Sequence, residues 1–308
     1  MGFIAYSLRR LGYAMVSVFV LSIIVFMTLH LAPGDPALMI AGQDAPERII
    51  QAVRERHGLD RPLLEQYLAW VSGMIVGDFG ISYRTSRVLA PDLFEAFRIS
   101  LVLGASALVL SIFVGIPLGL LAAIKRGSFT DFSVMFLAGI GMSVPGFWLA
   151  ILLILLFSLQ LGWLPFSGWG TVAQAILPAI ALSTSTTALM ARMARSLVVE
   201  TLLEDYVRTA RAKGLQDRVV LVKHALRNAM APIVTMIGLR FGLLVSGTVI
   251  TESVFSIPGL GRMLVQAVGL RDFPVVQAGT VLIVVTITVI NLVVDLTYSL
   301  LDPRIRYD

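Results

Sequence analysis

The sequence predicts an all-α polytopic membrane protein with six transmembrane helices. Of its 308 residues, 57% are hydrophobic and only 14% are charged, whereas about a quarter of the residues of a soluble domain are charged. Six apolar runs are long enough to cross a bilayer as helices. These runs cover residues 11–31, 99–124, 132–160, 176–195, 232–252 and 275–301. Lysine and arginine also gather in the loops of one side, as in membrane proteins with a defined orientation.

The distribution of positive charge predicts how these spans are oriented. Fourteen lysine and arginine residues fall on the side that holds both termini, whereas the short loops of the other side carry only Arg262 and Arg271. Cytoplasmic loops are enriched in positive charge, and long segments such as 32–98 cross a membrane largely regardless of charge. Both termini and the 200–230 loop are therefore expected in the cytoplasm.

A polar external segment, residues 32–98, is predicted after the first span. That span is too long for a signal peptide and lacks a small-residue cleavage site, so we expect it to be uncleaved. Within the segment, Pro62 marks the start of a helix whose apolar stripe runs from Leu63 to Ile75, and the turn sequence GDFG ends it. The favoured interpretation is a small subdomain that caps the membrane part, and a direct ligand site is the alternative.

Features inside the later spans predict local irregularities. Pro117 and Pro145 should kink the second and third spans, because proline removes a backbone hydrogen bond that neighbouring helices or water must replace. Residues 161–175 carry no charge and bring two tryptophans to an interface. The hydroxyl run at 183–187 is expected to form hydrogen bonds between helices, with the lining of a path as the alternative.

Several chemistries are excluded by residues that the chain lacks. It contains no cysteine, which excludes disulfides, thiolate catalysis and cysteine-based metal sites. Its three histidines, His30, His57 and His224, are far apart in sequence, which argues against a histidine metal site. No GxxxxGK[ST] phosphate-binding loop is present. We therefore expect no catalytic residue, no metal site and no cofactor in this chain.

One long basic segment, DYVRTARAKGLQDRVVLVKHALRNAMAP at 205–232, separates two membrane-length runs. Val207, Ala210 and Gly214 share one face of its first expected helix, and the cations lie off that face. Gly214 is suited to end the helix. With a second amphipathic piece at 217–228, the segment would form a knob that enters a groove of a partner protein. The alternative is an ordinary basic cytoplasmic loop.

Four motifs resemble the binding-protein-dependent ABC importer permeases of the dipeptide, oligopeptide and nickel type. TARAKG followed by HALRNAMAP is similar to the EAA loop of that family, and GLDRPLLEQYLAW with GDFGISY is similar to its external segment. The pattern E-x-x-F-x-x-P-G-L-G after the fifth span and the closing LDPR also resemble it. Arg208 and Thr209 stand where the general EAA motif has glutamate and alanine. The distance from Gly214 to Pro232 exceeds that of sugar importers, which favours the peptide type.

The resemblance implies a type I ABC importer permease fold, located in the bacterial inner membrane and without enzymatic activity of its own. It implies four kinds of partner: a second homologous permease subunit, two ABC ATPase subunits that hold ATP and Mg, an external substrate-binding protein, and membrane lipid. Nucleic acid is not expected. The EAA loop would form a coupling helix that docks on an ATPase subunit. The coupling residues implied are Asp205, Val207, Arg208, Ala210, Lys213, Gly214, Leu215, His224 and Asn228.

Candidates for a gate or pathway surround the turn after the fifth span. Pro258, Gly259 and Gly261 predict a tight turn, which the resemblance places near the external gate and the binding-protein interface. For Glu252, local pairing and a role in gating are equally supported. The candidates are Thr248, Thr251, Glu252, Phe255, Pro258 and Gly259.

Arg240 and Asp295 are the two ionisable residues that fall well inside predicted spans. Each lies about 10 Å from the expected cytoplasmic end of its helix. A lone charge within the bilayer costs about 3 kcal/mol, so the opposite charges predict an ion pair between the fifth and sixth helices. A proton relay is the less favoured interpretation.

The chain is thus predicted to be a permease subunit that forms half of the path of an ATP-driven importer, for di- or oligopeptides or a related small solute. Peptide, nickel, glutathione, opine and sugar remain open as substrates. The alternative is a stand-alone secondary transporter or channel, which should show coupling carboxylates or broken half-helices in repeated halves; neither is evident. The expected regions are 1–31 with the first span, the external segment 32–98, the permease core 99–302 including the 200–230 loop, and the cytoplasmic tail 303–308.

Overall fold

The computed structural model describes residues 3–31, 35–42, 44–214, 216, 219–220 and 227–301. Within these ranges all regular elements are helical, and an isolated β-bridge joins Ile81 to Val88. The elements are α1 (Phe3–Leu31), α2 (Pro36–Ala41), α3 (Glu47–Arg56), α4 (Leu63–Val76), α5 (Leu89–Ile124), α6 (Phe129–Ser143), α7 (Gly146–Leu153), the π-helical η1 (Ile154–Gln160), α8 (Val172–Leu203), α9 (Asp205–Ala212), α11 (Arg227–Val254), α12 (Leu260–Leu270) and α13 (Phe273–Leu301). The prediction of an all-α fold is confirmed.

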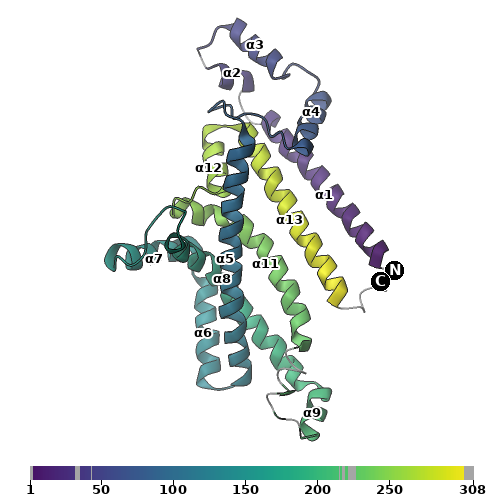
Figure 1. Ribbon diagram of the computed structural model, residues 1–308, viewed down its shortest axis with the longest axis vertical. Coiled ribbons are helices and arrows are strands. Elements are labelled where there is room, and N and C mark those ends of the chain that lie inside the picture. The colour runs from purple at the N-terminus through teal and green to yellow at the C-terminus, as the bar shows by residue number, and fades with distance from the viewer. Residues whose placement is uncertain are drawn as a thin grey trace.

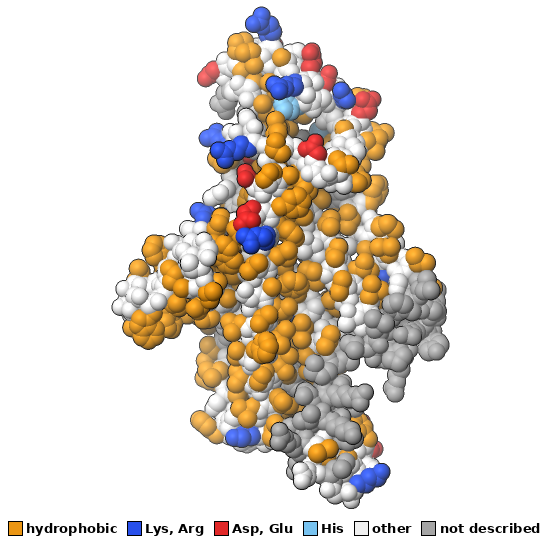
Figure 2. Space-filling view, viewed as in Figure 1, with side chains coloured by type: hydrophobic (Ala, Val, Ile, Leu, Met, Phe, Trp, Pro, Cys, Tyr) orange, Lys and Arg blue, Asp and Glu red, His pale blue; other side chains and the backbone are white. Residues whose placement is uncertain are grey.

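The helices form an elongated bundle, with α2, α3 and α4 at one end and α9 at the other (Figure 1). In the described part of the chain, five helices are long and apolar enough to cross a membrane, or six if α6 and the α7–η1 unit count as one bent span. Figure 2 shows hydrophobic side chains over the middle of the bundle and charged side chains gathered over the α2–α4 end. This distribution suits a protein whose middle is surrounded by lipid.

The third predicted span is broken rather than kinked. Helix α6 ends at Ser143, Pro145 precedes the first residue of α7, and the two halves meet at 101°. Proline lacks the N–H that would continue the backbone hydrogen bonds of α6. The sequence located the irregularity at Pro145 but underestimated its size. By contrast, α5 continues through Pro117 without a break.

Helices α5, α8 and α11 make up the centre of the bundle, and α5 meets α8 through small residues. Gly115 and Gly119 of α5 face the carbonyl oxygens of Thr187 and Ala191 in α8. A β-carbon on Gly119 would lie 2.3 Å from the Ala191 oxygen, so only glycine permits this approach. Small residues at one-turn spacing allow membrane helices to pack backbone against backbone.

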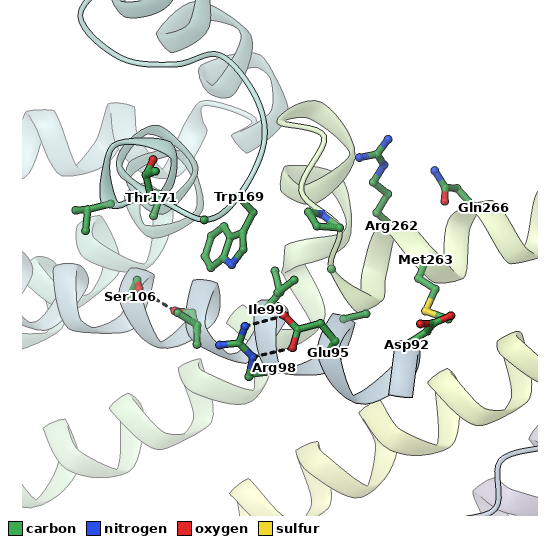
Figure 3. Close-up of a pocket in the computed structure, with 17 residues that line it drawn as sticks. Asp92, Glu95, Arg98, Ile99, Ser106, Trp169, Thr171, Arg262, Met263 and Gln266 are labelled. Atoms are coloured by element: carbon green, nitrogen blue, oxygen red, sulfur yellow. Dashed lines mark hydrogen bonds and ion pairs between the residues drawn. The ribbon is translucent and has the colours of Figure 1, made fainter. Parts of the chain in front are cut away.

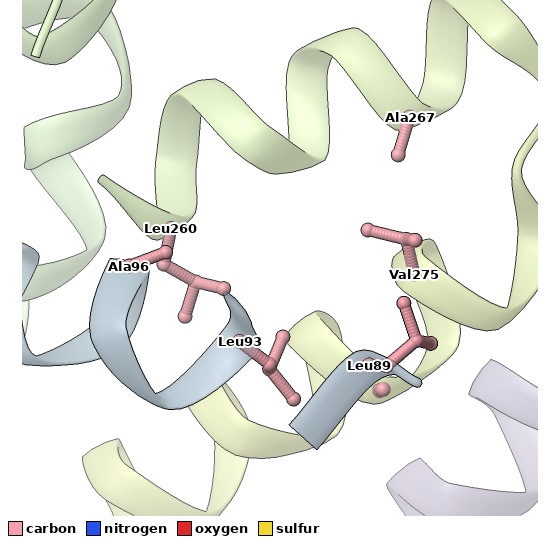
Figure 4. Close-up of a cluster of buried hydrophobic side chains, with 7 residues drawn as sticks. Leu89, Leu93, Ala96, Leu260, Ala267 and Val275 are labelled. Carbon is pink, nitrogen blue, oxygen red and sulfur yellow. The ribbon is translucent and has the colours of Figure 1, made fainter. Parts of the chain in front are cut away.

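A cluster of buried side chains joins the start of α5 to α12 and α13 (Figure 4). Leu89 and Leu93 come from α5, Leu260 and Ala267 come from α12, and Val275 comes from α13. Helix α5 is far from α12 and α13 in sequence, and the cluster holds the three together at the end of the bundle that carries α2–α4. It therefore fixes the position of α12, whose N-terminus adjoins the turn after α11.

An ion pair that the sequence analysis did not foresee ties α6 to α8. Arg195 donates two hydrogen bonds to the Asp131 carboxylate, at 2.5 and 2.7 Å, and Gly127 N–H donates a third at 3.0 Å. The Asp131 side chain is only 7% exposed. A carboxylate that is this well buried needs all of these donors, because removing one partner leaves an uncompensated charge.

Arg195→Met is therefore expected to destabilise the subunit by about 3 kcal/mol, since it strands the Asp131 carboxylate. Adding Asp131→Asn should recover most of this loss, because the asparagine oxygen can still accept from Gly127 N–H and carries no charge. Thermal unfolding of the detergent-solubilised subunit, followed by tryptophan fluorescence, measures both changes. Equal stability of the single and double variants would contradict a buried, mutually dependent pair.

Candidate translocation path and coupling loop

The coupling loop predicted at 205–232 begins with α9, an eight-residue helix from Asp205 to Ala212. Val207 and Ala210 are 0% and 6% exposed, and they form a cluster with Val220 against which Leu202 at the end of α8 packs. The apolar face predicted for this helix therefore packs against the protein's own chain. Ala210 is not on the surface that α9 offers to a partner, because its neighbours on α8 and at Val220 already occupy that space.

The exposed face of α9 carries Asp205 and Arg208. Asp205 and Arg208 form a loose surface pair at 3.9 Å, with side chains 98% and 83% exposed. Lys213 is exposed, and Gly214 adopts a φ of +78°, the left-handed conformation that glycine favours at a helix end. The predicted end of the helix near Gly214 is thus confirmed. Leu215 and His224 lie outside the described residues, and so does the side chain of Asn228 in α11.

The turn after α11 is built around Glu252, which is completely buried. Its carboxylate accepts hydrogen bonds from the Ser100 hydroxyl and, at 2.9 Å, from Arg262 N–H, while Leu260 N–H donates to Ser100 Oγ at 2.8 Å. Leu260 and Arg262 belong to the first turn of α12, whose backbone N–H groups and positive dipole end favour an anion. Glu252 therefore caps α12, and this geometry favours the local pairing that the sequence left equal with gating.

The glycines of this turn are needed because the carboxylate occupies the space beside them. A β-carbon on Gly259 would lie 2.3 Å from the Glu252 carboxyl carbon, and one on Gly261 would lie 2.6 Å from Cα of Val249. Phe255 is 1% exposed, and its carbonyl accepts from Gly168 N–H at 3.0 Å. The turn thereby holds the loop that precedes α8.

The remaining gate candidates occupy different surroundings. Thr248 and Thr251 are 1% and 8% exposed, so both are inside the bundle, and the Thr248 hydroxyl donates to the Val245 carbonyl at 3.0 Å. Pro258 faces a large cleft that opens at the end of the bundle near α12. The candidates therefore do not form one site: Pro258 and Gly259 line this cleft, whereas Thr251 lines a separate, partly open cavity.

The cleft beside Pro258 has a volume of about 980 Å³ and lies between α5, the loop before α8, and α12 (Figure 3). Figure 3 shows Glu95 and Arg98 paired on α5, with Trp169 and Arg262 on the other walls. Arg98 donates to Glu95 at 2.9 and 2.7 Å, and both side chains are more than half exposed. Sequence analysis missed this site, although charged residues at i, i+3 spacing before a span are a usable signal.

The segment between α1 and α5 is tied to the bundle by Asp272, between α12 and α13. Its carboxylate accepts from the Ser82 hydroxyl and, at 3.0 Å, from Tyr83 N–H. Burial raises the pKa of the Tyr83 hydroxyl, and the Asp272 carboxylate adds to this shift. Next to Tyr83, burial lowers the pKa of His57, with a further contribution from Arg56. His57 therefore stays neutral at a lower pH than a fully exposed histidine would, and its protonation on acidification would disfavour this packing.

The predicted ion pair between Arg240 and Asp295 is wrong. Asp295 on α13 pairs with Arg10 on α1 at 3.1 Å, because α13 packs beside α1 as well as α11 (Figure 1). Arg240 instead lines a cavity of about 260 Å³ between α7, α8 and α11. No ion pair or hydrogen bond joins its side chain to any other residue that the structure describes. Matched depth along two helices was not sufficient to identify the partner.

The hydroxyl run at 183–187 forms the predicted hydrogen bonds between helices and also lines a cavity. The Ser111 hydroxyl of α5 donates to the Ser183 carbonyl at 3.3 Å and accepts from the Thr187 hydroxyl at 3.2 Å. The three residues between, 184–186, line the same cavity as Arg240. One side of α8 therefore fastens the bundle, and the other side presents hydroxyl groups to this partly open cavity.

Comparison with known proteins identifies the class to which these features belong. Residues 115–307 match the family described as binding-protein-dependent transport system inner membrane component, and residues 3–117 match the N-terminal family of such membrane components. Over 302 residues, the chain is 43% identical to the glutathione transport system permease protein GsiC of Escherichia coli strain K12 and to that of Shigella dysenteriae serotype 1. These alignments cover 98% of this chain and 99% of each relative.

A solved structure of the MetNI methionine ABC transporter in an inward-facing conformation has a similar fold. The TM-score is 0.56 at 20% sequence identity, and the match covers 68% of this chain and 96% of that chain. The stand-alone secondary transporter or channel is not favoured by any of these matches. The chain belongs to the family of binding-protein-dependent transport system inner membrane components and is a multi-pass permease subunit of an ABC importer.

Proposed function

We propose that this permease carries short peptides or a related small solute such as glutathione, and that α9 couples its helices to the ATPase subunits. Two relatives that are 43% identical over nearly the whole chain are glutathione transport permeases, which supports a substrate of that size and chemistry. The proposed complex contains a second homologous permease, two ATPase subunits that bind ATP and Mg, and an external binding protein. Both termini and α9 face the cytoplasm, and the cleft beside Pro258 faces the binding protein.

The coupling role is supported by the packing of α9 against the end of α8. Its buried face, Val207 and Ala210, packs on Leu202 at the end of α8, while its charged face is exposed. A displacement of α9 is therefore passed directly to α8. From Leu203, α8 runs without interruption past Thr186 at the cavity beside Arg240, a length of about 25 Å. A rigid helix of this length can convert movement at the ATPase into movement along the solute path.

Gly214→Asp is expected to lower binding-protein-stimulated ATP hydrolysis about tenfold while leaving the subunit folded. Gly214 is exposed, and the described residues leave no atom within 4 Å of an added β-carbon. The new carboxylate would lie among the exposed cations of α9 and would oppose an acidic rim on the ATPase, where like charges are strongly disfavoured. Co-purification of the ATPase subunits with the tagged permease, followed by an ATPase assay, measures the effect.

Gly214→Asn is the matched control, because asparagine has the same shape as aspartate, tolerates the left-handed conformation equally well and carries no charge. It should retain most of the coupling. Ala210→Asp is expected to behave differently from Gly214→Asp, because it buries a charge between α9 and α8 and disorders the loop itself. Full stimulation of ATP hydrolysis in the Gly214→Asp complex would overturn the proposed role of this surface.

A further inference from the structure

The cavity beside Arg240, which is partly open at the surface of α11, combines a cation with several hydroxyl groups in the membrane-spanning part of the chain. Its volume is about 260 Å³, and its walls come from α7, α8 and α11. Arg240 and Thr251 line it from α11, and Ser185 and Thr186 line it from α8. Among the described residues that line this cavity, none is acidic. The cavity therefore carries a net positive charge.

Arg240 lies deep within its helix. The apolar span of α11 runs from Pro232 to Val254, so Arg240 is about 12 Å along the helix from Pro232. A charged side chain at such depth is costly and is found where it faces a water-filled cavity or a partner of opposite charge. Arg240 lies on the wall of a cavity, and this cavity leaves room for a partner of opposite charge.

The acidic residues of α11 and α13, Glu252 and Asp295, already have other partners. Asp295 pairs with Arg10, and Glu252 receives the hydrogen bonds of Ser100 and Arg262 N–H. Within the ranges that the structure describes, the guanidinium of Arg240 therefore has no counter-charge. The hydroxyls of Ser185, Thr186 and Thr251 likewise make no side-chain hydrogen bond to another described residue, so they too are available to a ligand.

We propose that Arg240, with the Ser185 and Thr186 hydroxyls of α8, binds a carboxylate group of the transported solute part-way through the membrane. The proposal rests on the proposed function, in which the solute is a short peptide or a relative of one, and such molecules carry a free carboxylate. A guanidinium presents planar N–H donors that match the two oxygens of a carboxylate. Hydroxyls on the opposite wall complete the site without adding charge, so a bound solute can leave again once the helices move.

The absence of cysteine from the chain permits a direct test. Leu243 lies one turn from Arg240, is 59% exposed and lines the same cavity, so Leu243→Cys places a single reactive thiol there. In the complete transporter complex, its labelling rates with anionic methanethiosulfonate ethylsulfonate and cationic methanethiosulfonate ethyltrimethylammonium are compared. Labelling is measured on this chain alone, and the same complex without Leu243→Cys gives the background.

The anionic reagent is expected to react about tenfold faster than the cationic one, because a fixed positive charge concentrates anions in a narrow cavity. Arg240→Gln should reduce this ratio to about one, whereas Arg240→Lys should preserve it. Millimolar trialanine should slow the labelling in the Arg240 complex, and trialanine amide, which lacks the carboxylate, should not. The protection by trialanine should disappear in Arg240→Gln.

Three results would overturn the site. A labelling ratio near one with Arg240 present would show that an acidic residue of the neighbouring permease already neutralises it. Equal protection by trialanine and its amide, or no protection by either, would exclude recognition of a carboxylate, and absence of labelling by both reagents would show that solute does not reach the cavity. The ratio is measured whether or not ATP is hydrolysed, so failure of this site and failure of the coupling proposal are distinguished.

Discussion

Gly119→Leu is expected to separate α5 from α8 and to prevent accumulation of the folded subunit. A β-carbon at this position would lie 2.3 Å from the Ala191 carbonyl oxygen and 2.8 Å from the Ala194 β-carbon. The first of these atoms belongs to the backbone, so no side-chain rotation relieves the contact, and the two helices must move apart. Overpacking of this kind costs about 3 kcal/mol, a large part of the stability of most domains.

The separation should also affect the remainder of the bundle. Ala123, Ala194, Val198 and Ile233 form a buried cluster shared by α5, α8 and α11, so movement of α8 exposes apolar surface on both of its neighbours. The measurement is the amount of monodisperse subunit after extraction in mild detergent, together with its thermal unfolding. We expect a loss of at least about tenfold in yield relative to the unchanged chain.

Gly139→Leu is the matched control, because it makes the same substitution inside a helix of the same bundle. At Gly139 in α6, no described atom lies within 4 Å of an added β-carbon, and leucine favours a helix more than glycine does. This variant should accumulate normally. If Gly119→Leu and Gly139→Leu accumulated equally, the close approach of α5 and α8 would not be a requirement of the fold.

Local features of this protein could be predicted from the sequence because their causes are local. The limits of α4 follow from Pro62, the apolar stripe and Gly77, and those of α9 follow from its periodicity and Gly214. The apolar runs similarly defined most of the spans. A helix end or an amphipathic face depends on residues within a few positions of it, so a single sequence contains the necessary information.

Pairings between distant residues could not be predicted in the same way. Arg240 and Asp295 have opposite charges at similar depths, yet Asp295 meets Arg10, because the neighbour of each helix face depends on how all the helices pack. For the same reason the partnership of Asp131 with Arg195 was not foreseen. The sequence also did not show that the apolar face of α9, with Val207 and Ala210, packs on Leu202 of α8.

Glu252→Ala is expected to destabilise the turn that starts α12 by about 3 kcal/mol. The substitution removes the acceptor of Arg262 N–H and of the Ser100 hydroxyl, and it leaves unfilled the completely buried space beside Gly259 and Gly261. It also removes the negative charge that the N-terminus of α12 favours. The loss should appear as a lower unfolding temperature and a lower yield of assembled complex.

Glu252→Gln should have a smaller effect, for a reason specific to Ser100. The glutamine oxygen can accept from Arg262 N–H, and its amide can donate to Ser100 Oγ, because a hydroxyl oxygen has two lone pairs and already accepts only from Leu260 N–H. The charge and the acceptor of the Ser100 hydroxyl proton are then lost, together at about 1–2 kcal/mol. Glu95→Ala is the matched control for loss of an acidic side chain, since Glu95 is exposed and, among the described residues, its ion pair is with Arg98 at the surface.

These variants also decide between the two roles that the sequence allowed for Glu252. If Glu252 caps α12, transport and ATP hydrolysis per folded complex in Glu252→Gln stay close to those of the unchanged protein. Only stability then declines, slightly in Glu252→Gln and more in Glu252→Ala. If it contacts solute as part of a gate, Glu252→Gln leaves stability unchanged and alters the transport rate. We expect the first result, a loss of stability alone. The Glu252 carboxylate is buried and already accepts hydrogen bonds from α5 and α12, so it is not accessible to a solute.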